Sequence, residues 1–298
     1  MLNRRHLVLG FVAALCATPA LAQEKINVVA TFSILGDLVK NIGGDRVVVA
    51  TLVGPNGNAH MFSPTPADAR KLGAAKVVFV NGLGFEGWMT RLVKASGTKA
   101  PTVVASAGIK TQKMEDDHHP GRMVTDPHAW QSIANVKVYV ANIRDGLRAA
   151  DPAGASVYDA NARDYLGKLD ALEQEVRAAL EKIPAARRKV ITTHDAFGYF
   201  ASAYGMEFIA PAGVSADSEP SAKDVARIIA QVKRQKIPAV FMENISDPRL
   251  MQQIARETGA KIGGTLYSDA LSDAGGPAAS TIEMMRSNVR ELTKALAP

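Results

Sequence analysis

Three histidines and one aspartate lie next to the ends of expected strands and helices, where functional side chains are commonly found. His60 lies in a loop rich in turn residues after an expected strand, His128 lies in a loop before an expected helix, and His194 directly follows an apolar strand. Asp269 follows the last expected strand in the same manner. Three neutral imidazoles and one carboxylate suit a borderline-soft divalent ion such as zinc. The four residues form a candidate metal site, although by spacing alone each histidine is also explained as an ordinary hydrogen-bonded loop residue.

The four residues are far apart in the chain, so only the folded protein can assemble them. Short apolar runs alternate with helical patterns, a rhythm typical of parallel βαβ units, whose ligand sites lie at the carboxyl ends of the strands. The expected strands span residues 26–31, 47–53, 77–80, 102–105, 189–193, 207–209, 239–242 and 261–266. The expected helices around them span residues 33–42, 66–74, 88–94, 134–150, 197–204, 221–235, 248–258 and 280–296. The two halves share this rhythm without a residue-level repeat.

One unusually long helix, residues 151–183, is expected between the two halves. Its apolar residues recur at steps of three and four, which is the period of a helix face and not of a strand: Tyr158, Ala162, Tyr165, Leu169, Leu172, Val176, Leu180 and Ile183. Pro152 fits the first turn of a helix, and Pro184 ends the run because proline cannot continue the hydrogen-bond ladder. About 30 residues at about 1.5 Å each give a rod of about 45 Å, enough to cross a domain.

These elements predict an α/β protein with two βα lobes, each built on a parallel sheet, joined by one long rigid helix. The predicted division is a signal peptide at 1–22, a first lobe at 23–150, the linking helix at 151–184 and a second lobe at 185–298. A polar interval, residues 108–123, interrupts the rhythm of the first lobe, and its segment 115–119 is predicted to be a solvated loop. The metal site is expected in the cleft between the lobes.

The first 22 residues have the features of an export signal. Arg4 and Arg5 precede an apolar run, and Ala20-Leu21-Ala22 has the small-x-small form of a cleavage site. Export by the Sec route is expected, and the two arginines are only a weak match to a twin-arginine signal. Cys16 is the only cysteine, and Leu15 before it does not suit lipid attachment, so a soluble periplasmic protein without disulfides is expected.

The overall charge excludes one class of partner. The formal net charge is +6 for the whole chain, and removing Arg4 and Arg5 leaves +4. The densest basic run is Arg187-Arg188-Lys189. A mild positive charge without long basic runs favours solubility and does not predict nucleic-acid binding.

The context of the candidate ligands resembles the metal-binding proteins of zinc and manganese ABC importers, over essentially the whole mature chain. In the first half, the stretches that carry the resemblance are Gly54-Pro55-Asn56-Gly57-Asn58-Ala59-His60, Pro64-Thr65-Pro66-Ala67-Asp68-Ala69, Asn81-Gly82-Leu83-Gly84-Phe85-Glu86-Gly87-Trp88 and Asp126-Pro127-His128-Ala129-Trp130. In the second half they are Thr193-His194-Asp195-Ala196-Phe197-Gly198-Tyr199-Phe200, Glu243-Asn244-Ile245-Ser246-Asp247-Pro248-Arg249 and Leu266-Tyr267-Ser268-Asp269.

This resemblance implies that His60, His128, His194 and Asp269 are the metal ligands and that the metal lies between the lobes. Members of the zinc type have histidine at the third position and members that resemble manganese and iron carriers often have glutamate, so the resemblance favours Zn²⁺ as the transported ligand, with Mn²⁺ or Fe²⁺ as the alternative. It further implies a non-enzymatic, monomeric protein that delivers its ion to the membrane permease of an ABC importer. A metallochaperone is a further expected partner. The rigid helix should limit hinge closure, so release is expected to involve local loop rearrangement.

Two further histidines and three carboxylates are candidates for auxiliary and orienting roles. His118 and His119 stand in an acidic segment, where zinc carriers of this type often have a long histidine-rich loop. These two residues are interpreted either as a weak auxiliary metal capture site or as part of a solvated loop. Metal-bound histidines are usually oriented through their other nitrogen by a carboxylate or carbonyl, and Asp126, Asp195 and Glu243 are the candidates, among which the sequence does not choose.

Rival functions find less support in the sequence. Residues 82–87 match the G-x-G-x-x-G pattern of dinucleotide-binding proteins, but they follow the third expected strand, and no acidic residue ends the next strand. His194 and Asp195 are adjacent, which does not make a hydrolase triad, and no G-x-S-x-G or H-E-x-x-H motif accompanies them. A zinc-dependent hydrolase and a metal-dependent adhesin remain as alternatives, the first separable by a dispensable ligand and the second by partner binding that does not require metal.

Overall fold

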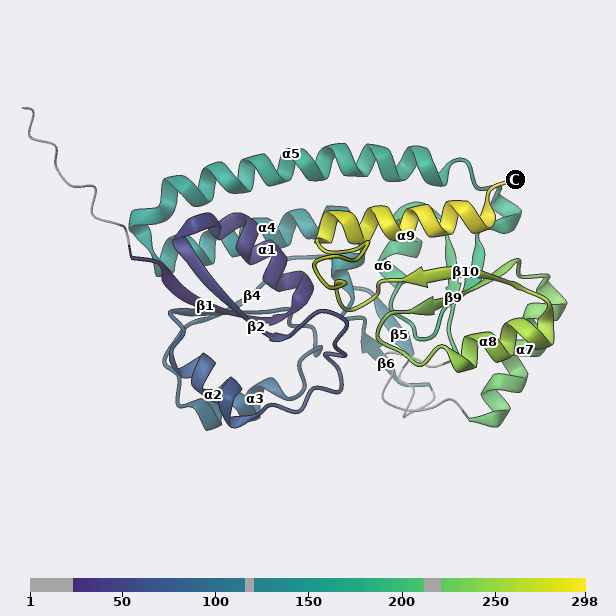
Figure 1. Ribbon diagram of the computed structural model, residues 1–298, viewed down its shortest axis with the longest axis horizontal. Helices are drawn as coiled ribbons and strands as arrows, with labels where there is room; N and C mark the ends of the chain where they lie inside the picture. The colour runs from purple at the N-terminus through teal and green to yellow at the C-terminus, as the bar shows by residue number, and fades with distance from the viewer. Residues whose placement is uncertain (1–23, 116–120, 212–220) are drawn as a thin grey trace, which may run out of the picture.

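The computed structural model describes residues 24–115, 121–211 and 221–298. The predicted signal peptide and the two histidines at 118 and 119 lie outside these described residues. Two four-stranded parallel sheets form two lobes that lie side by side, and one long helix runs along both of them (Figure 1). The predicted α/β class with two lobes and a linking helix is therefore confirmed.

The first lobe contains a sheet with strand order β2-β1-β3-β4. Its strands are β1 (Ile26–Phe32), β2 (Val47–Val53), β3 (Val77–Val80) and β4 (Thr102–Val104). Its helices are α1 (Ser33–Gly43), α2 (Pro66–Gly73), α3 (Met89–Ser96) and α4 (Ile133–Ala150). The continuous apolar residues of β3 are all buried, as expected for a central strand that is covered on both faces.

The second lobe repeats this topology. Its sheet has the order β10-β9-β7-β8. As in the first lobe, the first strand along the chain lies between the second and the third, here β7 between β8 and β9. Its strands are β7 (Lys189–Ile191), β8 (Glu207–Ile209), β9 (Ala239–Glu243) and β10 (Lys261–Leu266). Its helices are α6 (Gly198–Tyr204), α7 (Ala222–Gln235), α8 (Arg249–Thr258) and α9 (Thr281–Leu296). The shared rhythm of the two halves therefore corresponds to a shared strand order.

The long helix α5 (Ala155–Leu180) is shorter than the predicted 151–183. Pro152 begins a 3₁₀ turn, η3 (Pro152–Gly154), and Asp151 accepts hydrogen bonds from Arg46 and from the Tyr158 hydroxyl. Asp151 and the 3₁₀ turn after it therefore form a separate connection, and the α-helix begins only after Gly154. Its 26 residues still give a rod of about 39 Å.

The predicted apolar stripe of α5 is buried along its whole length, from Tyr158 to Leu180, and Ile183 just beyond the helix is buried as well. The helix contacts α1 and α4 of the first lobe and α9 of the second. One continuous hydrophobic core includes residues of both sheets and of this helix. A core that is shared in this way resists large movement of one lobe against the other, because such movement would expose apolar surface.

The polar interval contains a hairpin that was not predicted, while residues 116–119 of the predicted solvated loop lie outside the described residues. Lys113–Glu115 forms strand β5 and pairs antiparallel with β6 (Met123–Thr125). Met114 is the one buried residue of these two strands, and one buried side chain in a polar segment gives too little pattern for a strand to be recognised. None of the helices in the described ranges is long and apolar enough to cross a membrane.

Candidate metal centre

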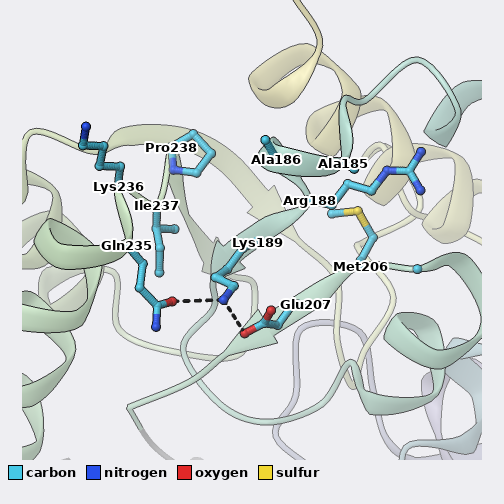
Figure 2. Close-up of a pocket in the computed structure, with 11 residues that line it drawn as sticks. Ala185, Ala186, Arg188, Lys189, Met206, Glu207, Gln235, Lys236, Ile237 and Pro238 are labelled. Carbon is cyan, nitrogen blue, oxygen red and sulfur yellow. Dashed lines mark hydrogen bonds and ion pairs between the residues drawn. The ribbon is translucent and has the colours of Figure 1, made fainter.

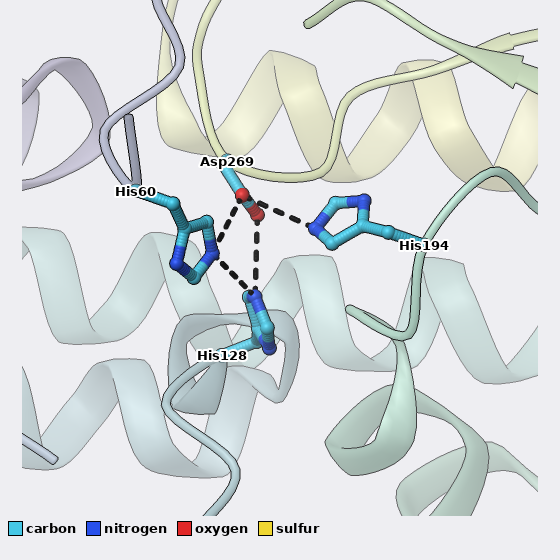
Figure 3. A group of neighbouring side chains, drawn as sticks. All are labelled: His60, His128, His194 and Asp269. Carbon is cyan, nitrogen blue, oxygen red and sulfur yellow. Dashed lines mark hydrogen bonds and ion pairs between the residues drawn. The ribbon is translucent and has the colours of Figure 1, made fainter. Parts of the chain in front are cut away.

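The structure brings the four predicted ligands together between the two lobes (Figure 3). One donor atom from each of His60, His128, His194 and Asp269 lies within 4.8 Å of the others. His60 and His194 each place Nε2 3.2 Å from Asp269 Oδ2, and His60 Nε2 is 3.2 Å from His128 Nε2. Donors of a tetrahedral ion with bonds of about 2.0–2.1 Å lie about 3.3 Å apart. The spacing of these atoms therefore fits a single ion at their centre.

His60 comes from the loop between β2 and α2. The carboxamide of Asn58 accepts hydrogen bonds from the backbone amides of His60 and Met61, at 3.0 and 3.2 Å, which forms a tight turn of the kind typical of asparagine. Trp88 Nε1 donates to the carbonyl of Ala59 at 2.8 Å. The imidazole packs edge-on against Phe85, with ring centroids 4.7 Å apart. These contacts hold the imidazole in place while 8% of the side chain remains exposed.

His128 is fully buried and has a carboxylate partner. Its Nδ1 lies 2.8 Å from Asp126 Oδ1, which also accepts a hydrogen bond from the backbone amide of His128. The Asn81 amide, at the carboxyl end of β3, donates to the carbonyl of Pro127 at 2.9 Å, and Tyr139 donates to the Asn81 oxygen. The predicted role of Asp126 as an orienting group agrees with this geometry. Asn81 and Tyr139 were not predicted, because nothing in their sequence positions indicates this contact.

His194 is also fully buried, and Glu243 is its partner. His194 Nδ1 lies 2.5 Å from Glu243 Oε2, and Glu243 Oε1 accepts hydrogen bonds from the backbone amides of Thr193 and His194 at 2.8 and 3.0 Å. Glu243 is the last residue of β9, so two neighbouring parallel strands position this pair at their carboxyl ends. The remaining candidate, Asp195, is half-buried and belongs to neither pair.

Asp269 follows β10 and is fully buried. Neither of its carboxylate oxygens accepts a hydrogen bond from a backbone or hydroxyl donor in the described part of the chain, and its close neighbours are imidazole nitrogens. A buried carboxylate without hydrogen bonds or a positive charge costs several kcal/mol. Asp126 and Glu243 add two more buried carboxylates nearby. The cluster therefore has the composition of a site that needs a cation.

The site shifts the pKa values of its members in opposite directions. Burial lowers the pKa of His60, and this effect exceeds the opposing influence of Asp269. Burial also acts to lower the pKa of His194, but Glu243 and Asp269 outweigh it and raise the pKa well above 6.5. Burial acts to raise the pKa of Asp269, yet the neighbouring histidines His194 and His128 hold it well below 3.8. Without a metal ion, a proton on His194 therefore provides the positive charge that Asp269 requires.

Trp130 and Gln131 bind the residue that precedes Asp269. Trp130 Nε1 donates to the carbonyl of Ser268 at 2.8 Å, and Gln131 Nε2 donates to the same oxygen at 2.7 Å. Both donors belong to the first lobe, and the acceptor immediately precedes Asp269. These buried bonds fix the loop of Asp269 against the first lobe. The sequence did not indicate them, because partners 138 and 137 residues apart are chosen only by the fold.

Residues 82–87 form a turn, as predicted, and not a dinucleotide site. Gly82, Leu83 and Gly84 all have positive φ values. The Glu86 carboxylate accepts hydrogen bonds from the backbone amides of Asn81 and Gly82 at 2.6 and 3.1 Å. In a phosphate-binding loop these amide groups would face the phosphate, so here the protein supplies the anion itself.

A separate cavity of about 420 Å³ lies in the second lobe (Figure 2). It is lined by residues at the amino ends of β7, β8 and β9, which is the edge of the sheet opposite to His194 and Glu243. Lys189 in its wall contacts Glu207 Oε1 at 2.9 Å and Gln235 Oε1 at 3.0 Å. Because this cavity lies at the opposite edge of the sheet, it does not extend the histidine cluster.

The chain is similar to known metal-binding proteins along nearly its whole length. A family model described as "Zinc-uptake complex component A periplasmic" matches residues 28–295. The iron-binding protein YfeA of Yersinia pestis is 34% identical over 289 residues, covering 95% of this chain and 92% of the relative. The manganese-binding lipoprotein MntA of Halalkalibacterium halodurans is 33% identical over 287 residues, covering 95% and 94%.

Solved structures show the same architecture. The periplasmic zinc binding protein TroA from Treponema pallidum aligns with a TM-score of 0.85 at 31% identity, covering 92% of this chain and all of that one. A manganese-bound periplasmic metal binding protein from Candidatus Liberibacter asiaticus aligns with a TM-score of 0.79 at 30% identity, covering 90% and 98%. The fold and the histidine-carboxylate cluster thus define a class, the two-lobed TroA-type metal-binding proteins. Within this class, the chain belongs to the family described as zinc-uptake complex component A.

Proposed function

We propose that this protein is an exported solute-binding protein that captures one divalent transition-metal ion and delivers it to an ABC importer. The ion is the cargo and not a catalytic cofactor. It would be held by Nε2 of His60, His128 and His194 and by the carboxylate of Asp269. Zn²⁺ is the proposed cargo.

The buried cluster around Asp269 carries this proposal. Four donors from distant parts of the chain lie within 4.8 Å of one another, and the outer nitrogens of two histidines face carboxylates. Paired histidine and carboxylate groups of this kind orient metal ligands and increase their basicity. A divalent ion would satisfy the oxygens of Asp269 that have no other donor among the described residues.

Two observations bear on the choice of cargo. The third ligand is His194, and imidazole suits zinc better than a carboxylate does. In contrast, relatives of similar identity are named for iron and manganese. Mn²⁺ or Fe²⁺ is therefore the second candidate for the same site.

An enzymatic role fits the site less well. A catalytic zinc ion usually has three protein ligands and an open position for a water molecule. Here four protein groups converge, and three of their side chains are completely buried. We therefore propose a carrier that hands its ion on.

The proposed partners and location follow from the family. We propose that the chain is exported to the periplasm with residues 1–22 as its cleaved signal and acts there as a monomer. It would deliver the ion to the permease of the importer, and a metallochaperone would be a further partner.

Competitive loading tests this proposal. The demetallated chain lacking residues 1–22 is offered equimolar Zn²⁺ and Mn²⁺, and native mass spectrometry with elemental analysis identifies the bound ion. One zinc per chain is expected, and the His194→Ala variant should lose it. A variant with both His118→Ala and His119→Ala is the matched control, because it removes two imidazoles that are not among the four proposed ligands and should keep the tight site.

Each other outcome has a definite meaning. Preferential retention of manganese would move the cargo to the second candidate while keeping the carrier role. A loss of the tight site in the control variant would show that the ligands are misplaced. Failure of the unaltered chain to hold either metal would refute the proposal.

A further inference from the structure

Asn56 stands at the tip of the loop that carries His60. The backbone amide of Gly57 donates to the carbonyl of Gly54 at 3.2 Å, and Asn56 has a φ of 54°. Proline at the first central position and a residue with positive φ at the second are the signature of a type II β-turn. Asparagine tolerates this left-handed conformation better than most residues. The turn therefore presents the side chain of Asn56 in a defined direction.

This side chain reaches across to the second lobe. Asn56 Nδ2 donates to Asp273 Oδ2 at 3.0 Å, and Asn56 Oδ1 accepts from Asn244 Nδ2 at 3.1 Å. The backbone amide of Asn56 donates to the carbonyl of Leu271 at 2.9 Å. All three partners lie close in sequence to residues of the metal centre, since Leu271 and Asp273 follow Asp269 and Asn244 follows Glu243. One residue thus connects the loop of His60 with the two segments that supply the carboxylates of the second lobe.

This connection lies where the loop of His60 would have to move for the ion to leave. His60 is the ligand with residual exposure, whereas the side chains of the other three ligands are fully buried. An ion that leaves the cluster must therefore pass the loop of His60. Asn56 and Asp273 are exposed, so water can replace their hydrogen bonds at small cost. The buried bonds from Trp130 to Ser268 have no such replacement and would persist.

We propose that Asn56 is a positioning residue that holds the His60 loop against the Asp269 loop and thereby sets the rate at which the bound ion leaves. This inference rests on the proposed function, because it assumes that the four-residue cluster holds the cargo. Asn56 touches no ligand atom. It acts through the two loops that it joins, and its loss should increase the dissociation rate more than it decreases the association rate.

Asn56→Gly is the first test. Glycine is favoured at this position of a type II turn, so the turn and the backbone bond to Leu271 should remain while both side-chain bonds are lost. Zinc-loaded protein is mixed with an excess of a colorimetric chelator in a stopped-flow instrument, and the rate of Zn²⁺ transfer is recorded. Two exposed hydrogen bonds, each at the lower end of the usual range, predict a release rate about fivefold faster than in the unaltered chain. The control is Asn41→Ala, at an exposed asparagine whose amide bonds only within α1.

A reciprocal exchange separates positioning from general weakening. Asp273→Ala removes the other partner, and should increase the release rate severalfold without altering the turn. Asn56→Asp alone places two carboxylates together and should also release faster. Asn56→Asp combined with Asp273→Asn restores a donor facing an acceptor with reversed roles, and should bring the release rate back close to that of the unaltered chain. A merely structural defect at Asn56 would not be repaired in this way.

The outcomes are distinguishable. If the unaltered chain loads Zn²⁺ and Asn56→Gly releases it at the same rate, the role of Asn56 is refuted and the carrier function stands. The same conclusion follows if the exchanged pair remains as fast as Asn56→Asp alone. If Asn56→Gly does not fold, Asp273→Ala carries the test, since only a surface side chain changes. If the unaltered chain holds no Zn²⁺, the proposed function itself fails.

Discussion

Replacing Glu243 by glutamine tests how the second lobe would prepare His194 for the proposed metal ion. Glu243 Oε1 is held by two backbone amides, at 2.8 and 3.0 Å, and Oε2 lies 2.5 Å from His194 Nδ1. A carboxylate at this position favours the proton on Nδ1, which leaves the lone pair of Nε2 free for the ion. In Glu243→Gln the remaining oxygen should stay with the backbone amides, so the NH₂ group would face Nδ1. A donor facing Nδ1 favours the other tautomer, with the proton on the nitrogen that must bind metal.

The size of the effect follows from this geometry. Removing a group that orients a metal-bound histidine typically weakens metal affinity by about 10–100-fold. Here the substitution both removes a negative charge beside the ligand and blocks the binding nitrogen. We therefore expect a loss near the upper end of the range, about 100-fold, which corresponds to about 2.7 kcal/mol.

The assay is a competition titration of Zn²⁺ between the protein and a chelating dye at fixed pH. Glu257→Gln is the matched control, because it removes an exposed carboxylate of α8 in the same lobe. Calorimetry in two buffers of different ionisation enthalpy adds a second readout, the number of protons released when Zn²⁺ binds. Glu243 is one of the two groups that raise the pKa of His194. Near pH 7 the Glu243→Gln variant should therefore release fewer protons than the unaltered chain.

The reasoning would be refuted by a variant that binds Zn²⁺ within about twofold of the unaltered chain and releases the same number of protons. Such a result would mean that the contact between Glu243 and His194 neither selects the tautomer nor supplies charge. A thermal melt of the metal-free variant shows whether it is folded. A loss of affinity without a loss of melting temperature assigns the effect to the site.

Three further predictions concern pH, the lobe contact and the core. The raised pKa of His194 stabilises the metal-free protein fully below about pH 6.5, and this stability is lost as the pH rises through the folded pKa. The lowered pKa of Asp269 stabilises it fully above about pH 3.8, and this stability is lost as the pH falls through the folded pKa of Asp269. Urea denaturation should thus show the largest stabilisation by this pair between about pH 3.8 and 6.5. Zn²⁺ affinity should rise with pH, because fewer protons compete for the imidazoles. An affinity that does not change between about pH 5 and 8 would contradict a protonated His194 in the metal-free protein. Trp130→Phe removes a buried bond to Ser268 and should lower the free energy of unfolding by about 0.5–1.5 kcal/mol, measured by thermal denaturation, and an unchanged melting temperature would show that this bond is dispensable. Leu172→Ala, in the buried face of α5, should cost about 2–5 kcal/mol in urea denaturation, and a cost below about 1 kcal/mol would mean that the helix is not an integral part of the core.

The elements of the fold were predicted where the pattern is local. Strands β2 and β3 begin and end at the predicted residues, because short apolar runs between turn residues are visible within a few positions. The stripe of α5 was visible for the same reason. The first residue of this helix was predicted wrongly, and the bonds of Asp151 with Arg46 and Tyr158 at that end exist only after the chain has folded. The hairpin of β5 and β6 was missed because Met114 is the one buried residue of its two strands, which gives too little pattern.

The candidate site also combines features that the sequence predicted with features that it did not. The candidate ligands were identified from their place after strands and from their sequence context, and the structure brings all four together. The choice of Asp126 and Glu243 as orienting groups was left open, because each partner is selected by strand order and by the direction of a side chain. Asn56 gave no signal in the sequence as a contact to Asp273, for the same reason.

The amino-acid sequence by itself determined the types of the candidate metal donors, the periodicity of the long helix and the alternation of strands and helices, all of which depend on neighbouring residues. The tertiary structure alone decided the distances among the four donors, the carboxylate that faces each histidine and the contacts that join the His60 loop to the second lobe. These depend on which strands lie side by side at the carboxyl edges of two sheets, and on a helix that holds those edges together. Residues far apart in the chain become neighbours only when the burial of a shared core fixes both lobes at once.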